Sequence, residues 1–497
     1  ESATNRFNLV DEPWIPVAGA GLVSLMRIFT DHSLRALGGN PVQKIALIKL
    51  LLAIAQAAAT PRDEAEWEAL GADGLAAKCL EYLSAKRDYF WLYGDKPFLQ
   101  MRTLARYKEQ TIGTIVPYVS TGNTTILNQS QIESPATDSE WALILIVEQN
   151  FALKGTKAYG ALTADDSKGK GKATKSGPAL GPKGNLHSFI LLDSILQTVY
   201  LNFFTKEMIS GLGFEEVGLP AWELQIDDRT DINARSIQNS YLGRLCPLSR
   251  FIVKDQSRLQ YCEGIVYSDH RDGATDPSIA KGYTEKSGAY FVLTVDPIKR
   301  PWRDLTALLS FFSNGSRRDV TCAQLKNTLT KSRLLDRFDE FSVWSGGVVI
   351  TGDSYEQYPK SDDDFVDSEL RLRTSFFRDN SGWLSALNLE LNELEILSTE
   401  VKNSTYKNQK REIADSKERD KRADALAGNS QALFWQLAER QFQALVDACT
   451  DASKAKEMRK TFAAYALQAY DAFCPKDTAR QLDAWAANKP HLGKYLA

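Results

Sequence analysis

Helical spacing of apolar residues in the last quarter of the chain limits the possible folds more than any other feature. From Trp383 onward the sequence reads as helix. The clearest stripe repeats at intervals of four, four, three and four residues: Phe434, Ala438, Phe442, Leu445 and Cys449. This spacing lines one face of an amphipathic helix. Similar stripes occur in 387–401, 462–473 and 478–485. Four such helices predict a four-helix bundle over residues 381–497.

The part of the chain before residue 381 has a mixed pattern. Helical spacing covers residues 43–59 and 64–85, whereas residues 215–380 are rich in β-branched and aromatic residues broken by Gly, Pro and Asp. Short strings such as Phe251–Val253 and Tyr290–Val295 are typical of strands. The sequence therefore predicts an α+β protein, in which a large mixed N-terminal domain (1–380) precedes the helical bundle (381–497).

Overall charge and cysteine usage exclude several classes of protein. The 60 basic and 63 acidic residues give a net charge of −3. The chain is therefore not a uniformly basic protein that coats nucleic acid, and any contact with nucleic acid must come from local basic patches. The six cysteines are scattered without a CxxC pair, and Cys246 and Cys262 are too far apart for a typical zinc pair. We expect free thiols in a reducing cytoplasm.

No segment predicts export or membrane insertion. The first residues contain no apolar stretch of the signal-peptide kind, so we expect no signal peptide. The longest apolar run, 45–59, is interrupted by Lys49 and Gln56 and predicts a buried core helix. We therefore expect a cytoplasmic protein with no membrane partner.

One stretch differs sharply from its surroundings. Residues 154–184 contain seven lysines and two acids, and the part from Ser167 to Gly177 has almost no large apolar residue. This composition is typical of a basic, glycine-rich loop emerging from a folded core. Two interpretations stay open: a solvated linker, or a loop whose glycines let its backbone enter a DNA minor groove.

Residues able to carry catalysis are sparse. The four histidines lie far apart, and there is no phosphate-binding loop, no dinucleotide fingerprint and no nucleophile elbow. The acids Asp362, Asp363, Asp364 and Glu369 could bind a divalent metal, but adjacent carboxylates of an extended chain point to opposite faces. We expect no metal, no cofactor and no enzymatic activity.

Two further stretches invite an interpretation. The mixed-sign segment 402–422 has eight basic and four acidic residues, and it predicts a solvated connection between two bundle helices. The glycine-rich stretch 344–358 predicts a hairpin or an exposed loop.

Several short motifs, taken in order, resemble one known family. They are Phe7–Val17 (FNLVDEPWIPV), Lys96–Gln100 (KPFLQ), Ile126–Gln129 (ILNQ), Trp344–Gly347 (WSGG) and the helix around 434–448. Together they resemble the large subunit of the type I-E CRISPR Cascade complex, the CasA family, over essentially the whole chain. Each motif is short, and it is their joint order that makes the match specific.

The resemblance implies a non-catalytic role in antiviral defence. In this family the guide RNA reads the target by base pairing, and the large subunit recognises the short PAM in double-stranded DNA. The implied partners are the CRISPR guide RNA, the other Cascade subunits, the target DNA and a helicase-nuclease that is recruited to the R-loop. The implied fold, a mixed domain followed by a four-helix bundle, agrees with the pattern described above.

The resemblance also assigns residues to functions. A loop that contacts the guide-RNA handle and neighbouring subunits falls on Ile126, Leu127 and Asn128. A glycine-rich loop at the PAM minor groove falls on the following residues: Gly169, Lys170, Gly171, Lys172 and Gly177. Lysines alternating with glycines depart from the family pattern and should add attraction to phosphates.

Two further DNA contacts are implied. A glutamine wedge that splits the first base pair is assigned to Gln357, which we expect at the tip of the segment 355–358, between two tyrosines. A minor-groove lysine of the family has no counterpart here, and Arg271 is its expected substitute. Two alternatives to this function stay open: a metal-dependent nuclease using the Asp362–Asp364 cluster with Glu369, and a purely structural scaffold.

Overall fold

The computed structural model describes most of the chain. It describes residues 5–496 apart from 102–108, 110, 118–135, 155–179, 182, 256–257, 272, 286, 297–299, 310–319, 331–332, 353–356, 360–364, 379–381 and 413–415. These residues form two compact units. The first comprises Glu1–Pro297, Arg317–Arg337 and Phe341–Glu369, and the second comprises Ile298–Ser316, Phe338–Glu340 and Leu370–Ala497.

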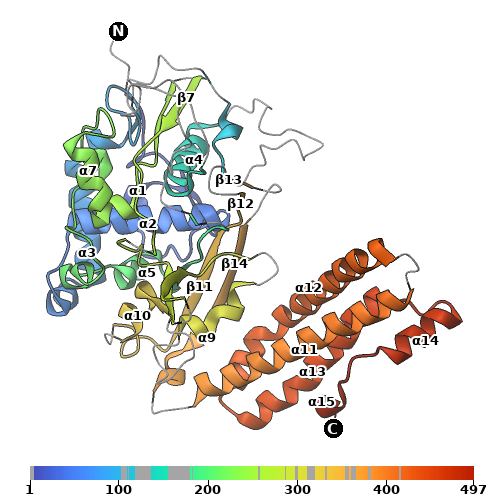
Figure 1. The fold of residues 1–497 in the computed structure, drawn as a ribbon. Coiled ribbons are helices and arrows are strands. Elements are labelled where there is room, and N and C mark those ends of the chain that lie inside the picture. The colour runs from blue at the N-terminus through green and yellow to red at the C-terminus, as the bar shows by residue number, and fades with distance from the viewer. Residues whose placement is uncertain are drawn as a thin grey trace. The chain divides into compact units, whose positions relative to one another are not determined.

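The first unit contains both helices and strands, and helices dominate the second (Figure 1). The helices are α1 (Leu25–Thr30), α2 (Pro41–Ala58), α3 (Glu64–Ala85), α4 (Asp138–Phe151), α5 (Ile195–Asn202), α6 (Lys206–Ser210), α7 (Ile232–Asn239), α8 (Tyr241–Leu245), α9 (Leu305–Leu308), α10 (Ala323–Thr330), α11 (Trp383–Glu412), α12 (Ser416–Ala448), α13 (Ala452–Phe473), α14 (Ala479–Ala487) and α15 (Gly493–Leu496). The strands are β1 (Arg6–Asn8), β2 (Ile15–Val17), β3 (Gly21–Val23), β4 (Trp91–Tyr93), β5 (His187–Leu191), β6 (Arg250–Asp255), β7 (Arg258–Glu263), β8 (Ala280–Thr284), β9 (Ala289–Val292), β10 (Val320–Cys322), β11 (Glu340–Val348), β12 (Thr351–Gly352), β13 (Gln357–Tyr358) and β14 (Phe365–Arg373). The predicted α+β fold is confirmed.

Helix α2 is the central element of the first unit and packs against α3, α4, α5 and α8 (Figure 1). It starts with a capping box between Asn40 and Gln43, with Pro41 at its first position. Its length and composition would allow it to cross a membrane, but 78% of its residues are buried inside the protein. The prediction of a buried core helix is confirmed.

Two three-stranded sheets accompany these helices, with strand orders β14-β11-β5 and β10-β8-β9. Strand β11 runs antiparallel to β5, with Trp344 opposite Phe189 and Gly346 opposite His187. Residues 341–348 are all buried. The prediction of an exposed loop or hairpin is therefore wrong for 344–348, and only the β12–β13 pair that follows is a hairpin.

A buried ion pair joins α2 to the turn before β8. The ammonium of Lys49 lies 2.7 Å from Oδ2 of Asp276, and both side chains are almost inaccessible to solvent. The other carboxylate oxygen of Asp276 accepts hydrogen bonds from the backbone N–H and the hydroxyl of Ser278, at 3.0 and 2.7 Å. Because Lys49 and Ser278 donate to the two carboxylate oxygens, the cost of burying the Asp276 charge is offset at both oxygens.

Two histidines are buried around this pair. Nδ1 of His187 lies 2.8 Å from the Ser278 hydroxyl, and the backbone N–H of Asp276 donates to Nδ1 of His270. Because the Ser278 proton points to Asp276, His187 must donate from Nδ1. Burial, together with the nearby Lys49 ammonium, lowers the pKa of His187 to about 4. Burial also lowers the pKa of His270 well below its ordinary value.

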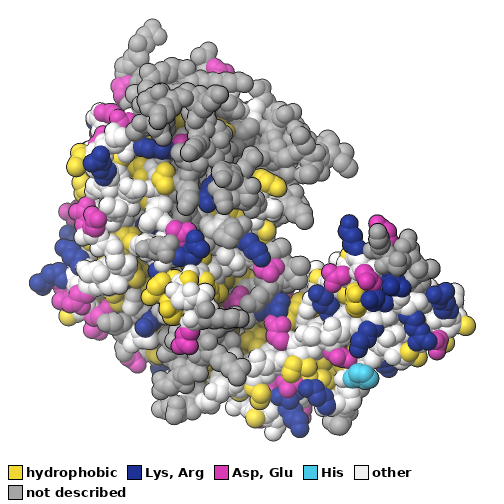
Figure 2. All heavy atoms as spheres, in the orientation of Figure 1, with side chains coloured by type: hydrophobic (Ala, Val, Ile, Leu, Met, Phe, Trp, Pro, Cys, Tyr) yellow, Lys and Arg dark blue, Asp and Glu magenta, His cyan; other side chains and the backbone are white. Residues whose placement is uncertain are grey.

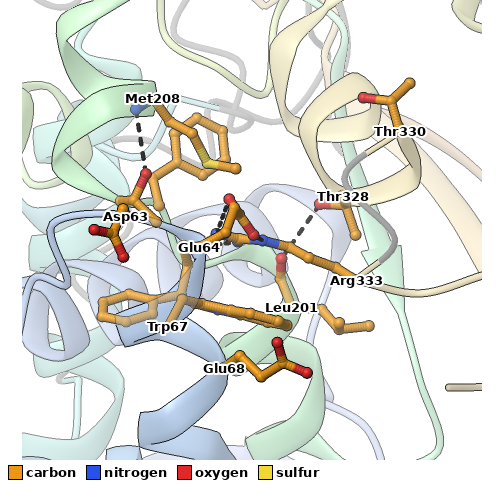
Figure 3. A network of polar contacts seen from close by, with 12 residues as sticks. Asp63, Glu64, Trp67, Glu68, Leu201, Met208, Thr328, Thr330 and Arg333 are labelled. Atoms are coloured by element: carbon orange, nitrogen blue, oxygen red, sulfur yellow. Dashed lines mark hydrogen bonds and ion pairs between the residues drawn. The ribbon is translucent and has the colours of Figure 1, made fainter. Parts of the chain in front are cut away.

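A second buried network fixes α3 against the segment that follows α10 (Figure 3). Arg333 donates to both carboxylate oxygens of Glu64, at 2.9 and 3.0 Å, and also to the carbonyl of Phe203. Its guanidinium lies 4.1 Å from the ring centroid of Trp67, which stacks on Tyr200. This bidentate, aromatic-covered geometry is the one that suits a buried arginine.

The second unit is built from α11, α12 and α13, which pack against one another, with the shorter α14 packed on α11. Earlier residues contribute to its core: Trp302 packs on Trp435 and Phe442, with ring centroids 5.6 and 4.1 Å apart. Glu390 of α11 accepts two hydrogen bonds of 2.7 Å from Arg459 of α13. The helical C-terminal region that was predicted is confirmed.

The predicted solvated connection over 402–422 is wrong in extent. Helix α11 continues to Glu412 and α12 begins at Ser416. Charges of the two helices pair with each other, Lys410 with Asp420 at 3.2 Å and Lys402 with Asp424 at 3.9 Å. In Figure 2 basic and acidic side chains are interspersed over the bundle. The mixed-sign segment therefore forms solvated helix faces.

The buried histidines predict that acid destabilises the first unit. His187 has a folded pKa of about 4, below its unfolded value of about 6.5, so the unfolded state binds the proton first and stability is lost as the pH falls from about 6.5 towards 4. Between pH 7 and pH 5 this linkage removes roughly 2 kcal/mol from the free energy of unfolding. Urea denaturation at the two pH values measures it.

The variant His187→Asn should flatten this pH dependence, since asparagine does not titrate and keeps a side-chain N–H donor. The control is His491→Asn, which changes an exposed histidine. Equal pH slopes in wild type and His187→Asn would contradict the assignment.

Candidate nucleic-acid interface

Most residues assigned by resemblance lie outside the described part of the chain. These are Ile126, Leu127 and Asn128 of the RNA-handle loop, and Gly169, Lys170, Gly171, Lys172 and Gly177 of the lysine–glycine segment. Asp362, Asp363 and Asp364 also lie outside it. The structure does describe the residues from which these segments start and to which they return, and these residues are the basis of the candidate site.

Gln357 joins the two ends of the lysine–glycine segment. Helix α4 ends at Phe151, the segment follows Lys154, and the described chain resumes at Leu180 and Gly181. The Gln357 backbone N–H donates to the carbonyl of Lys154 at 3.0 Å, and the Lys154 N–H donates to Oε1 of Gln357 at 3.2 Å. Nε2 of Gln357 donates to the carbonyl of Gly181 at 2.6 Å. We call these three hydrogen bonds the Gln357 clamp.

Gln357 is buried, its partners Lys154 and Gly181 are half-buried, and both ends of the Gln357 carboxamide form hydrogen bonds. Gln357 is 5% exposed and lies in β13, opposite Gly352 of β12. The expectation that it occupies a hairpin tip is therefore wrong, because residues 353–356 form the connection between these strands and Gln357 follows it. Its role as a wedge stays a prediction. In this structure the side chain bonds to the protein backbone.

Close backbone contacts fix the returning end of the segment. Gly184 has φ +86°, and a Cβ there would lie 1.9 Å from the carbonyl oxygen of Val348. A Cβ on Gly347 would lie 2.4 Å from the carbonyl oxygen of Asn185. Gly347 is thus required by the close approach of β11 to the chain leading into β5, whereas a Cβ on Gly346 would lie 2.7 Å from the Trp344 ring.

The outgoing end of the segment is fixed through α4. The guanidinium of Arg250 donates from Nε to Glu148 at 3.0 Å, and a second nitrogen donates to the carbonyl of Leu153. The side chain of Gln149 forms two hydrogen bonds of 2.9 Å with the backbone of Arg250. These residues were not among those predicted from the sequence. Their signal was the polar triplet Glu148–Asn150 directly after the apolar run Trp141–Val147 of the same helix.

The chain is also anchored directly before and after the stretch 102–137, which carries Ile126, Leu127 and Asn128. The backbone N–H of Met101 donates to Ile252 of β6 at 2.8 Å. At the other end, Asp138 opens α4 and accepts a hydrogen bond of 2.9 Å from the hydroxyl of Tyr93 and another from Arg6. Both predicted loops therefore start from and return to strands and helices of one folded unit.

Arg271 lies on the surface, with its side chain 53% exposed. Its guanidinium donates to both carboxylate oxygens of Asp269, at 3.2 and 3.1 Å. A DNA phosphate or base would have to compete with this neighbouring carboxylate. Asp269, the residue that Arg271 contacts, is not part of the Gln357 clamp.

The described residues do not assemble a metal site. Among them there is no group of three or more His, Cys, Asp or Glu side chains placed to bind a metal ion. Asp367, which follows the predicted acidic cluster, accepts a hydrogen bond of 3.1 Å from the Trp344 indole. Cys246 and Cys262 are buried free thiols, and burial raises the pKa of each to about 12.

These features define a class of protein. It has an α+β unit, in which Gln357 holds the two ends of a basic segment together, followed by a helical bundle. The chain belongs to the CRISPR-associated protein Cse1 family, whose model matches residues 8–469. This is the family of the large subunit of type I-E Cascade, as the sequence motifs predicted.

Individual relatives agree with this membership. The curated CasA/Cse1 protein of Thermus thermophilus is 27% identical over 329 residues, which span 61% of this chain and 60% of that relative. The crystal structure of Thermus thermophilus CasA has a TM-score of 0.75 at 20% identity and covers 99% of both chains. Thermobifida fusca Cse1 has a TM-score of 0.75 at 19% identity over 98% of this chain and 96% of that one.

A further match is a chain of a structure described as a CRISPR RNA-guided surveillance complex. It has a TM-score of 0.70 at 14% identity and covers 99% of both chains. At these identities the solved structures establish the common fold.

The Gln357 clamp predicts a measurable local stability. Replacing Gln357 by Leu keeps the side-chain size and removes both side-chain hydrogen bonds, which leaves the Lys154 N–H without its acceptor. Losing such buried hydrogen bonds costs about 1–3 kcal/mol of local opening free energy. We expect amide hydrogen exchange at Lys154 to accelerate about tenfold or more, measured by mass spectrometry.

The matched control is Gln443→Leu, because Gln443 forms the same type of paired hydrogen bonds with the backbone of Arg371 in the second unit. That variant should leave exchange at Lys154 unchanged. Unchanged exchange at Lys154 in Gln357→Leu would show that the clamp does not close the base of the segment.

Proposed function

We propose that this Cse1-family chain is a non-catalytic subunit that recognises the PAM in double-stranded target DNA. It then promotes duplex opening and R-loop formation within a cytoplasmic guide-RNA complex, and it presents a platform for a helicase-nuclease. The lysine–glycine segment (Gly169, Lys170, Gly171, Lys172, Gly177) is the proposed DNA contact, and Ile126, Leu127 and Asn128 are the proposed contacts to the guide-RNA handle.

The Gln357 clamp is the observation that carries this proposal. A basic, glycine-rich segment whose ends make no contact with each other is typical of a solvated linker. Here one buried side chain and two close backbone contacts fix both ends to strands of a packed unit. Positioning of this kind favours a recognition loop, because a rigid base reduces the entropy lost on binding.

Charge supports DNA as the partner. The chain as a whole is slightly acidic, yet residues 154–184 hold seven lysines and two acids. Lysines attract phosphates without reading sequence, whereas glycine backbone can approach the floor of a narrow minor groove. The guide-RNA and Cascade partners are supported by the family and by the similarity to a chain from an RNA-guided surveillance complex.

The central prediction concerns PAM dependence. Guide-RNA complexes reconstituted with this chain should bind duplex DNA with an intact PAM more tightly than DNA with a scrambled PAM at one fixed salt concentration. Complexes that lack the chain should bind both alike. Electrophoretic mobility shifts with labelled duplexes measure the difference.

If the chain assembles but discrimination does not change, the chain acts as a scaffold. Magnesium-dependent cleavage by the purified chain, abolished by Asp363→Ala, would establish the nuclease alternative in its place.

A second prediction concerns salt dependence. Changing Lys168, Lys170, Lys172 and Lys175 to Gln should make the plot of log affinity against log salt shallower, by about one unit for each phosphate that is no longer neutralised. Fluorescence anisotropy of a labelled PAM duplex at several salt concentrations measures this slope for the reconstituted complex.

The control changes four exposed lysines of the bundle to Gln: Lys407, Lys454, Lys456 and Lys460. It removes the same charge and should keep the wild-type slope. Equal slopes for both quadruple variants would contradict a phosphate contact by the lysine–glycine segment.

A further inference from the structure

The β8–β9 hairpin carries an exposed aromatic surface that the proposed PAM contacts do not use. Tyr283 and Tyr290 lie directly opposite each other on the two strands and are 44% and 52% exposed. Their ring centroids are 5.2 Å apart at an interplanar angle of 63°. In such an edge-to-face pair one ring contributes only an edge, so an aromatic face stays open to a ligand.

A lysine completes this surface. Lys281 precedes Tyr283 by two residues and therefore lies on the same face of β8. Its ammonium lies 4.5 Å from the ring centroid of Tyr290, and it has no carboxylate partner among the described residues. Thr321 of β10 and Val292 of β9, both opposite Lys281, extend the same face. We call Lys281, Tyr283 and Tyr290 the tyrosine platform.

The two strands of the hairpin also pack against each other on the opposite face. Gly282 lies between Lys281 and Tyr283 and points to the opposite side, where a Cβ would lie 2.4 Å from the ring of Phe291. The Phe291 ring thus covers the glycine and fixes the two strands against each other. The platform is consequently supported by a packed strand pair.

A groove of about 380 Å³ adjoins the platform. It is lined by both tyrosines and Lys281, together with Leu212, Pro277 and Ile279. The acidic residue along it is Asp276, whose carboxylate is neutralised by Lys49 at 2.7 Å. Counting only residues that the structure describes, the groove therefore offers aromatic and apolar walls, the Lys281 ammonium and no free carboxylate.

We propose that the tyrosine platform binds single-stranded nucleic acid, and specifically the DNA strand displaced when the target duplex opens. Bases stack on exposed aromatic rings of a sheet face, and a nearby ammonium attracts the phosphates. A protein partner fits this face less well, because protein interfaces need a broad, well-packed apolar core.

The chemistry of the platform favours the displaced strand over the guide RNA. The platform offers ring faces and one ammonium, which accept any base, and its three residues include no amide or carboxylate to read base edges. The displaced strand has a new sequence with every target, whereas the handle of a guide RNA is constant. The identity of this strand rests on the proposed function, since only an opened duplex supplies it.

The test compares the double variant Tyr283→Ala/Tyr290→Ala with wild type. The purified full chain is titrated against fluorescein-labelled oligothymidylate, oligouridylate of equal length and a duplex, at one salt concentration. We expect the variant to bind oligothymidylate about tenfold or more weakly, because each lost base stack has an effect of that order. Tyr283→Phe/Tyr290→Phe keeps both rings and should bind like wild type.

The matched control is Leu22→Ala/Leu219→Ala, which truncates two exposed apolar side chains elsewhere on the first unit. It should bind oligothymidylate like wild type, and circular dichroism should show the same fold for all variants. Wild-type affinity in the Tyr→Ala pair, or no binding of oligothymidylate by the wild-type chain, would overturn the proposal. So would a clear preference for oligouridylate.

A second measurement in the complete complex identifies the strand. 5-Iodouracil placed in the displaced strand should crosslink under ultraviolet light to the peptide containing Tyr283 and Tyr290, and crosslinking to iodouracil in the guide RNA alone would overturn the assignment. PAM discrimination should persist in the Tyr→Ala complex. If the wild-type complex shows no PAM discrimination while the wild-type chain still binds oligothymidylate, the proposed function is contradicted. Binding of single-stranded nucleic acid by the tyrosine platform is then still supported.

Discussion

The buried ion pair between Lys49 and Asp276 is the interaction on which the first unit depends. An unpaired charge in this position would be severely destabilising, so α2 and the turn at 276–278 can pack only in the arrangement that joins them. The same turn leads into β8. Through Ser278, whose carbonyl accepts from the Ser188 N–H at 2.8 Å and whose hydroxyl contacts His187, it also fixes β5. One polar contact thereby sets the positions of two strands from different sheets.

Both candidate binding surfaces derive from these two strands. Strand β5 follows the returning end of the lysine–glycine segment, and close contacts at Gly184 and Gly347 bind that end to β11. Strand β8 carries Lys281 and Tyr283 of the tyrosine platform. A segment that contacts a ligand can have low local stability when it starts from buried strands such as β5 and β8. In the proposed function the core thus provides the rigidity, and the lysine–glycine segment and the tyrosine platform provide the contacts to nucleic acid.

Prediction from the sequence succeeded where structure depends on neighbours along the chain. The helical stretch 64–85 has the predicted limits, because periodicity and an N-terminal cap are local signals, but a kink at Gly71, with φ +62°, divides it into two helices. Prediction failed for contacts between distant residues. In the sequence Lys49 only interrupts an apolar run and Gln357 only suggests a hairpin tip, because their partners, Asp276 and Lys154, lie far away along the chain. Family resemblance assigned a function to the lysine–glycine segment and to Gln357, but it could not show that Gln357 holds the two ends of that segment together.

The Gln357 clamp also restricts how this side chain can act on DNA. To insert beside a base pair, its carboxamide would have to leave the Lys154 N–H and the Gly181 carbonyl, and each buried group left without a partner costs about 1–3 kcal/mol. If Gln357 acts as the predicted wedge, it cannot form the clamp at the same time. If DNA withdraws the side chain, the base of the lysine–glycine segment loosens in the same step. By thermodynamic reciprocity, fixing that base would then oppose insertion, so PAM contact and strand separation would be coupled through a single glutamine.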